Sequence, residues 1–216
     1  AINAGGVTMH SMFGLPLTSF IPNNDFVDLN IANNRSSLKK HMRFRKEKRK
    51  LFQELDLLII DEISMVRADL LDAIDFILQD VRQNKEAFGG LQVIFIGDLY
   101  QLPPVVRAQE MEVLHAREYE AAYFFHAMAL RGKDITYIDL KKIFRQKDIF
   151  FTDLLNQIRT NQGVENALKI INDACYQSDA LVDKQAIVLT TTNQRADSIN
   201  HAEMLALDTE IKVYRG

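Results

Sequence analysis

Two short apolar runs, separated by one amphipathic segment, constrain the fold of this chain more than any other feature. The runs occupy residues 57–60 and 93–96, and uninterrupted apolar residues are typical of parallel strands that are covered on both faces. Between them, apolar residues over 67–83 recur with the 3.6-residue period of a helix. Gly89-Gly90 then predicts a turn into the second run. Strand, crossover helix and strand predict an α/β fold with a parallel sheet.

The rest of the chain continues this alternation. Apolar runs at 135–140 and 186–189 predict two more strands, and helical patterns cover 148–160 and 164–176. The composition changes over 178–185, just before the last run. We therefore expect a domain boundary at that segment, with one domain over 1–180 and a second beginning at 181.

The composition excludes several classes of protein. Hydrophobic residues make up 47% of the chain and charged residues 25%, as in globular domains. No apolar run approaches the ~18 residues that a membrane-spanning helix needs. The single cysteine, Cys175, cannot form an internal disulfide, and it excludes zinc sites built from several cysteines. A reducing compartment is expected.

Positive charge is concentrated in one segment. Residues 35–50 contain nine Lys/Arg and one acid, a balance of +8, whereas the remainder has a balance of −11. A basic cluster on an acidic body favours nucleic acid as a partner. The alternative is a helix face that is simply solvated.

Two adjacent acids follow the first apolar run. Asp61 and Glu62 are expected at the C-terminal tip of a buried strand, the edge at which open α/β sheets bind ligands. One carboxylate could hold Mg²⁺, which favours one or two carboxylates together with waters and phosphates. The other could orient or deprotonate an attacking water. Alternatively, both acids cap the next helix.

Further polar residues follow the second run, in residues 97–104. Gln101 can both donate and accept hydrogen bonds, so it could contact a terminal phosphate and the attacking water together. A turn that begins at Asp98 and ends at two prolines is the alternative. Because neighbouring parallel strands end at one edge, we expect Asp61, Glu62, Asp98 and Gln101 to lie close together.

Two other segments contain candidate functional residues. Arg145 follows the predicted third strand, and arginine commonly neutralises charge on a transferred phosphoryl group, although most arginines are surface cations. Thr8, His10 and Ser11 follow a glycine pair and could approach a nucleic-acid backbone closely. A capping turn before a helix explains the same residues equally well.

In this order, these segments resemble the petite integration frequency family of superfamily 1 DNA helicases, in its bacterial form. The matching segments are 1–11 for motif Ia, 61–66 for motif II (Walker B), 66–84 for the family signature, 97–104 for motif III, 144–146 for motif IV, and 190–193 with 199–200 for the opening of the second motor domain. The resemblance implies a RecA-like parallel sheet flanked by helices over 1–180. It implies the beginning of a second RecA-like domain over 181–216.

The resemblance implies a function and a compartment. The parent protein is expected to be an ATP-dependent helicase that moves 5′-to-3′ on single-stranded DNA and unwinds forked or partial-duplex DNA. Replication, repair or recombination, in the cytoplasm at the bacterial nucleoid, is the implied setting. ATP and Mg²⁺ are the implied cofactors.

The resemblance also implies roles for individual residues. Asp61 coordinates Mg²⁺, Glu62 activates water, Gln101 senses the γ-phosphate and Arg145 acts as an arginine finger. Thr8, His10 and Ser11 are implied to lie near single-stranded DNA. For the basic segment 35–50, a DNA-backbone role is expected without assignment to any one residue.

One family element is missing from the 216 residues. The only Gly-Lys pair, Gly132-Lys133, fails the Walker A pattern because Ala127 and Asp134 occupy positions that require Gly and Ser/Thr. That loop would precede the motif Ia segment, and the later family motifs would follow Gly216. We therefore expect this chain by itself to hydrolyse little ATP and to unwind DNA poorly.

Two other functions are compatible with parts of the pattern. A catalytically silent nucleic-acid-binding module would not need Asp61, Glu62, Gln101 and Arg145 together. A RecD-type recombination helicase shares several of the motifs, but the stretch 66–84 favours the family named above.

Overall fold

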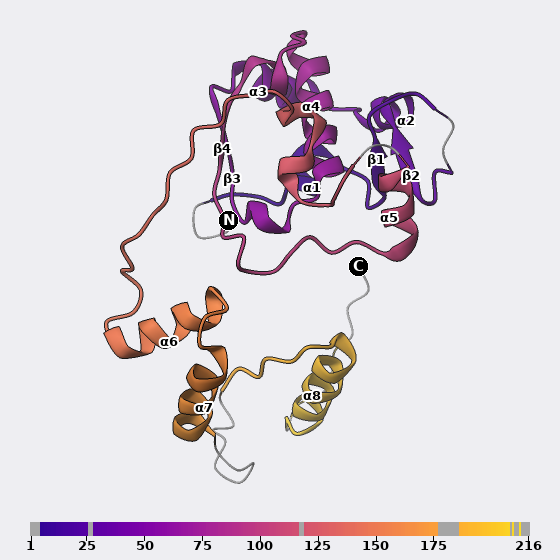
Figure 1. Ribbon diagram of the computed structural model, residues 1–216. Coiled ribbons are helices and arrows are strands. Elements are labelled where there is room, and N and C mark those ends of the chain that lie inside the picture. The colour runs from indigo at the N-terminus through magenta and orange to yellow at the C-terminus, as the bar shows by residue number, and fades with distance from the viewer. Residues whose placement is uncertain are drawn as a thin grey trace. The chain divides into compact units, whose positions relative to one another are not determined.

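The computed structural model describes residues 5–25, 28–116, 119–176, 186–207, 209 and 212 (Figure 1). Their contacts divide the chain into two units, 1–147 and 148–216. The helices and strands of the first unit, with short 3-10 helices written η, are α1 Met9–Phe13, β1 Ser19–Ile21, β2 Ala32–Asn34, α2 Arg35–His41, α3 Lys46–Glu54, β3 Leu57–Ile60, η2 Ile63–Met65, α4 Ala68–Arg82, η3 Ala87–Gly90, β4 Gln92–Phe95, α5 Ala108–His115, η4 Phe124–His126 and η5 Met128–Leu130. The second unit contains α6 Ile149–Arg159, α7 Val164–Cys175 and α8 Asn193–Leu205.

The strand–helix–strand prediction is confirmed. β3 and β4 lie side by side and pair in parallel, with Leu57 opposite Gln92 and Ile60 opposite Phe95 (Figure 1). α4 provides the crossover between them. The expectation that both faces of the strands are covered was wrong for the described residues. Leu58 and Ile60 are buried, whereas Leu57 and Ile59 on the other face are exposed.

Helix α4 forms the centre of the core. Its large apolar side chains that are fully buried follow the predicted 3.6-residue period, and they are Leu71, Ile74, Ile77, Leu78 and Val81. Burying each such side chain contributes roughly 1.5–3 kcal/mol. Gln83, at φ 53°, ends the helix, and η3, which contains Gly89 at φ 64°, turns the chain into β4.

A second parallel pair, which the sequence did not reveal, is held by a buried ion-pair network. β1 pairs with β2, and the Phe20 amide donates to Asp69 Oδ2 over 2.8 Å. Asp69, fully buried in the first turn of α4, also accepts from Arg67. Arg67 reaches Glu110 in α5 over 2.9 Å. Although burial by itself lowers the pKa of Arg67, these two carboxylates raise it, so the arginine stays charged.

Asp72 fixes the segment that follows α5. Its buried carboxylate accepts hydrogen bonds from the Tyr119 hydroxyl (2.5 Å), the Met128 amide (2.9 Å) and the Ala129 amide (2.8 Å). Burial raises the pKa of Asp72 to about 6, and the three donors oppose that rise. This one side chain of α4 therefore holds both η5 and Tyr119, which precedes η5 in the chain, against α4.

The predictions of a third and a fourth strand were wrong for the described residues. Residues 135–140 and 186–189 form no ladder in the described part of the chain, and their apolar side chains are exposed. An apolar, β-branched run favours extended backbone, but a strand also needs a neighbour in register. No element that the structure describes supplies that neighbour.

In the second unit, the two predicted helices are confirmed. Asp148 caps α6 by accepting from the Phe151 amide over 3.0 Å, and α6 packs against α7 through the buried Leu154 and Ala167. Thr192 caps α8. The predicted boundary at 178–185 lies outside the described residues and stays a prediction. No described helix is long and apolar enough to cross a membrane.

Candidate functional site

The ends of β3 and β4 are joined by backbone hydrogen bonds. The Ile96 amide donates to the Ile60 carbonyl and the Ile63 amide donates to the Ile96 carbonyl, each over 2.9 Å. The polar residues that follow the two strands, Asp61-Glu62 and Asp98, therefore leave the same sheet edge. The structure brings together the segments that the sequence placed there.

The Asp61-Glu62 turn has an unusual backbone. Glu62 adopts the left-handed conformation (φ 54°, ψ 42°), which costs a residue with a side chain ~1–2 kcal/mol. Such strain clusters at functional sites. Asp61 Oδ1 accepts from the Glu62 amide over 2.9 Å, while Oδ2 has no partner among the described residues. Both side chains are exposed, so one carboxylate oxygen of Asp61 and the whole Glu62 carboxylate are available to a ligand.

A tight turn orients Gln101. Asp98 accepts from the Tyr100 amide over 3.1 Å and from Gln101 Nε2 over 3.3 Å, and its carbonyl accepts from the Gln101 amide over 3.0 Å. The Gln101 side chain remains exposed. Asp98 therefore positions the amide, a role that the sequence signalled only through the spacing of the two residues.

Two further residues shape this edge and were missed from sequence. A Cβ on Gly97 would lie 2.9 Å from Ile63 Cγ2 and 3.0 Å from the Ile63 nitrogen, so only glycine lets β4 end against the 61–64 turn. Ser64 Oγ is buried without a hydrogen-bond partner among the described residues. Neither feature has a sequence signal beyond its place in the motif.

The donor set at this edge fits a magnesium ion shared with phosphate. Within the described residues, no group of three or more His, Cys, Asp or Glu side chains is placed to hold a metal. Mg²⁺ in nucleotide sites needs only one or two carboxylates, because water and phosphate oxygens complete its shell. The available oxygen of Asp61 meets that requirement.

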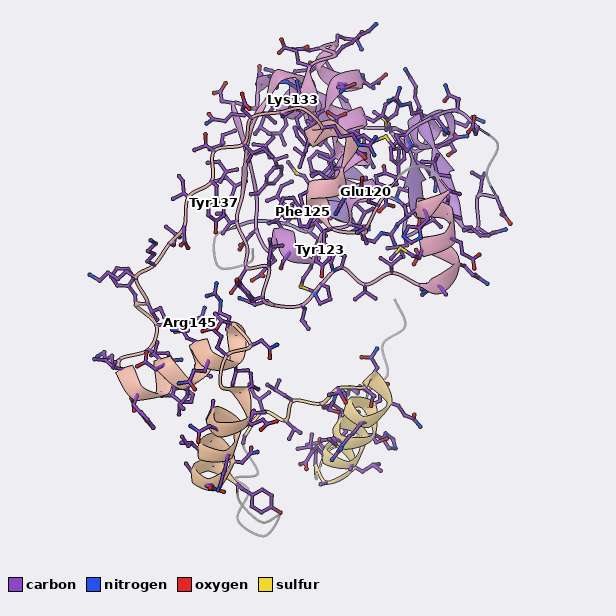
Figure 2. The ribbon with its side chains drawn as sticks, viewed as in Figure 1. Glu120, Tyr123, Phe125, Lys133, Tyr137 and Arg145 are labelled. Atoms are coloured by element: carbon purple, nitrogen blue, oxygen red, sulfur yellow. The ribbon has the colours of Figure 1, made fainter. Side chains whose placement is uncertain are left out.

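Arg145 is not brought to this edge by any described contact. It lies in the stretch between η5 and α6, where every side chain from Arg131 to Phe150 is exposed. Figure 2 shows Arg145 on this extended segment, outside any helix or strand. Its predicted role therefore stays a prediction.

Thr8 caps helix α1, as the alternative for this motif proposed. Its hydroxyl accepts from the Ser11 amide over 3.3 Å, and Gly14 at φ 61° ends the helix. His10 is half-buried and Ser11 is exposed. The cap uses the Thr8 hydroxyl as an acceptor, and contact of these residues with DNA stays a prediction.

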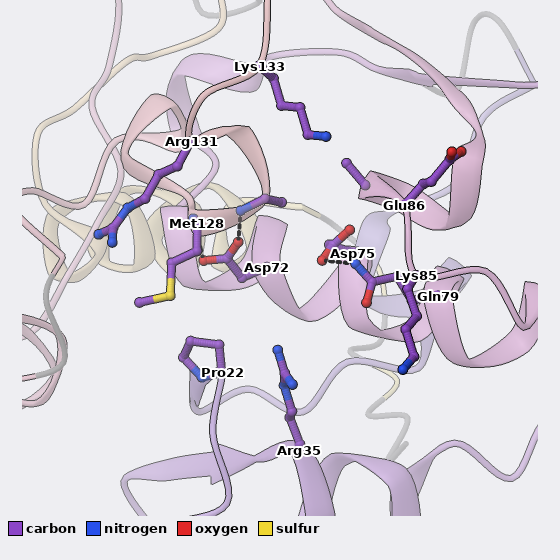
Figure 3. Close-up of a pocket in the computed structure, with 12 residues that line it drawn as sticks. Pro22, Arg35, Asp72, Asp75, Gln79, Lys85, Glu86, Met128, Arg131 and Lys133 are labelled. Atoms are coloured by element: carbon purple, nitrogen blue, oxygen red, sulfur yellow. Dashed lines mark hydrogen bonds between the residues drawn. The ribbon is translucent and has the colours of Figure 1, made fainter.

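One pocket of the described residues lies away from the strand edge. Its volume is about 270 Å³, and it lies beside α4. The residues that line it are mostly charged (Figure 3), and they are Pro22, Arg35, Asp72, Asp75, Gln79, Lys85, Glu86, Ala87, Met128, Ala129, Arg131 and Lys133. Four cations and three acids line the pocket, and two of the acids, Asp72 and Asp75, accept structural hydrogen bonds from backbone amides.

Comparisons with known proteins give one consistent result. Residues 1–169 match the model of the PIF1-like helicase family. The ATP-dependent DNA helicase PIF1 of Candida albicans is 32% identical over 218 residues, which cover 99% of this chain and 22% of that protein. The Bacteroides Pif1 helicase, solved in complex with ADP-AlF3 and ssDNA, is 36% identical with a TM-score of 0.79, covering 98% of this chain and 46% of the solved one.

A further solved structure concerns forked DNA. It describes DNA unwinding at forked dsDNA by two coordinating Pif1 helicases, and it is 37% identical with a TM-score of 0.78. The match covers 94% of this chain and 45% of the solved one. The chain thus spans less than half the length of each of these relatives.

Proposed function

This chain belongs to the PIF1-like helicase family, and from that premise we propose that the whole protein is an ATP-dependent DNA helicase. The predicted RecA-like α/β fold class is confirmed by the likeness to the solved Pif1 structures. The observation that carries the proposal is the shared strand edge. There, Asp61 and Glu62 follow β3 and the Asp98–Gln101 turn follows β4, the two strand ends are joined by backbone hydrogen bonds, and Glu62 has a left-handed backbone conformation.

The residues at this edge would divide the work of ATP hydrolysis. Asp61, with one oxygen available, holds Mg²⁺, which when bound supplies positive charge to the phosphate oxygens. Glu62 orients and deprotonates the attacking water, since its carboxylate is exposed and unpaired among the described residues. Gln101, held by Asp98, contacts the terminal phosphate and that water together.

The remaining predicted residues would couple hydrolysis to movement. Arg145 acts as an arginine finger that contacts the phosphates. Thr8, His10 and Ser11 lie along single-stranded DNA. Closure of two RecA-like domains around ATP changes their hold on the strand. We propose 5′-to-3′ translocation and unwinding of forked or partial-duplex DNA in replication, repair or recombination, on the cytoplasmic chromosome.

We also propose that residues 1–216 alone hydrolyse little ATP. The Walker A pattern is absent from them, so they lack the backbone amides and lysine that hold the β- and γ-phosphates in this class of motor. Substantial turnover by the isolated 216 residues would contradict this proposal.

ATP turnover, with and without single-stranded DNA, tests the proposal in the full-length protein. We expect DNA-stimulated turnover that Glu62→Gln lowers by about 10²–10⁴-fold, because the variant keeps the shape and loses the base. Glu54→Gln is the matched control, since Glu54 is exposed on α3 and, among the described residues, forms an ion pair only with Lys50. Full-length protein that binds single strands without turnover would instead identify a silent binding module.

A further inference from the structure

The basic segment forms a corner between two helices, and five of its cations have no ion-pair partner among the described residues. We define the α2–α3 corner as Lys40, Arg43, Arg45, Lys46 and Arg49. No ion pair or side-chain hydrogen bond involves any of the five within the described part of the chain. Two neighbours are compensated, since Lys39 pairs with Asp80 over 2.6 Å and Lys50 with Glu54 over 3.5 Å. Clustered cations repel one another, so an anionic partner would relieve an unfavourable arrangement.

The corner is held rigidly by its apolar residues. Burial alternates along the link between the helices. Met42 is buried and Phe44 is half-buried, whereas Arg43 and Arg45 are exposed. Phe44 packs edge-on against Phe52, which is fully buried in α3. Since backbone and anchors are fixed by packing, the cations are presented on a preformed surface.

The corner is also attached to the motif Ia helix. Phe52 stacks on Phe13 of α1 with ring centroids 5.2 Å apart and planes 2° apart. Lys48 lies over the Phe44 ring and donates to the Ser11 carbonyl over 2.9 Å. A DNA strand that runs along His10 and Ser11 would therefore lie next to the corner.

We propose that the α2–α3 corner binds the phosphate backbone of the double-stranded arm of a forked DNA. The proposal rests on the helicase function proposed above and adds a duplex contact to it. Nonspecific single-strand sites combine cations with aromatic rings on which bases stack. Here the rings that pack at the corner are engaged, Phe13 and Phe52 inside the core and Phe44 beneath Lys48. Cations without available rings suit the phosphates of a duplex, whose bases are already stacked.

The test measures DNA binding by the full-length protein as a function of salt. Its substrates are a forked DNA, the blunt duplex of its arm and a dT oligomer. The corner variant combines Lys40→Gln, Arg43→Gln, Arg45→Gln and Lys46→Gln. Each lost phosphate contact reduces the slope of log K against log salt by about 0.9 on duplex. We expect the slope for fork and blunt duplex to become shallower by about 3–4, with dT binding and dT-stimulated ATP turnover unchanged.

A matched variant controls for net charge. Lys85, Lys133, Lys141 and Lys169, all exposed and outside the corner, are changed to Gln together. This variant should keep the duplex slope within about one unit. Equal unfolding midpoints for both variants and wild type would exclude a folding defect.

Each remaining outcome decides the proposal. An unchanged slope on fork and duplex in the corner variant overturns it. An equal loss on dT and duplex also overturns it, and assigns the corner to the single-strand track. The corner variant could have the expected shallower slope on duplex while the wild-type protein shows no DNA-stimulated ATP turnover. That result would confirm duplex binding by the corner and refute the helicase function.

Discussion

Residues 57–60 and 135–140 are two apolar runs of one unit with opposite outcomes. The first becomes β3, and Ile60 is 3% exposed. The second stays extended without a ladder, and Ile138 is 76% exposed. The difference lies in what surrounds each run, since β4 pairs with the first and α4 joins it in one core. Propensity therefore sets the local backbone, while burial needs a partner.

The two faces of β3 repeat this contrast at the scale of single residues. Ile60 points into the core, whereas Ile59, the next residue, is 54% exposed. Removing side chains at the two positions measures how much of the strand's stability comes from its covered face.

The largest expected effect is that of Ile60→Ala. Truncating a buried isoleucine removes apolar contacts and leaves a cavity, which should lower the free energy of unfolding by about 2–5 kcal/mol. Ile59→Ala on the open face should cost less than about 1 kcal/mol, because this side chain is 54% exposed. Urea unfolding of both variants measures these changes, and equal costs would mean that both faces of β3 are covered.

The next effect concerns Asp72, the last fixed point before the exposed run. In Asp72→Asn an amide N–H₂ must face one of the three donors, so the variant should lose about 1–3 kcal/mol at neutral pH. The amides of Met128 and Ala129 should then exchange hydrogen faster. Asp153→Asn, an exposed site on α6, is the control. Unchanged protection of these two amides would contradict the role of Asp72.

The same side chain predicts a pH dependence. Because burial raises the pKa of Asp72 from 3.8 to about 6, the folded state binds more protons than the unfolded state between those values. This contribution to the free energy of unfolding therefore decreases as pH rises from about 4 to 6, by up to ~3 kcal/mol. Urea unfolding of wild type and Asp72→Asn across this pH range gives the difference between their free energies of unfolding, and this difference should decrease as pH rises. An increase would mean that ionisation is favoured by folding.

Gly97→Ala tests the joint between the two strand ends. The added methyl group meets the Ile63 backbone, which cannot move without parting the strand ends, and should cost about 1–3 kcal/mol. Amide resonances of Ile63 and Ser64 should shift in NMR spectra, while those at the start of β4 stay in place. A variant with wild-type stability and unshifted resonances would refute the close approach.

The smallest effect is expected in the exposed run. Ile138→Ser should change the free energy of unfolding of these 216 residues by less than about 0.5 kcal/mol, because the side chain has little contact to lose. The same unfolding assay applies. A cost approaching that of Ile60→Ala would show that 135–140 is covered.

Much of the candidate site at the strand edge was predictable because its elements are local. The apolar run before Asp61-Glu62 and the second run before the Asp98–Gln101 turn are each contiguous in sequence, and parallel pairing brings their ends together. Three features were not predictable, namely the left-handed backbone of Glu62, the lack of room for a Cβ at Gly97 and the buried Ser64 hydroxyl. Each depends on atoms from another strand or turn.

The sequence alone determined the helices α4, α6 and α7, the β3–α4–β4 unit and the motifs of the family, because these depend on short-range periodicity and on residues adjacent along the chain. Tertiary structure alone decided which apolar runs become strands, which acids become buried anchors and which cations remain unpaired. In the sequence, nothing distinguishes Asp69, Asp72 and Lys48 from charged residues on the surface. Their long-range partners, Phe20 for Asp69, Ala129 for Asp72 and Ser11 for Lys48, lie 37 to 57 residues away in the chain, and only folding brings those partners within hydrogen-bonding distance.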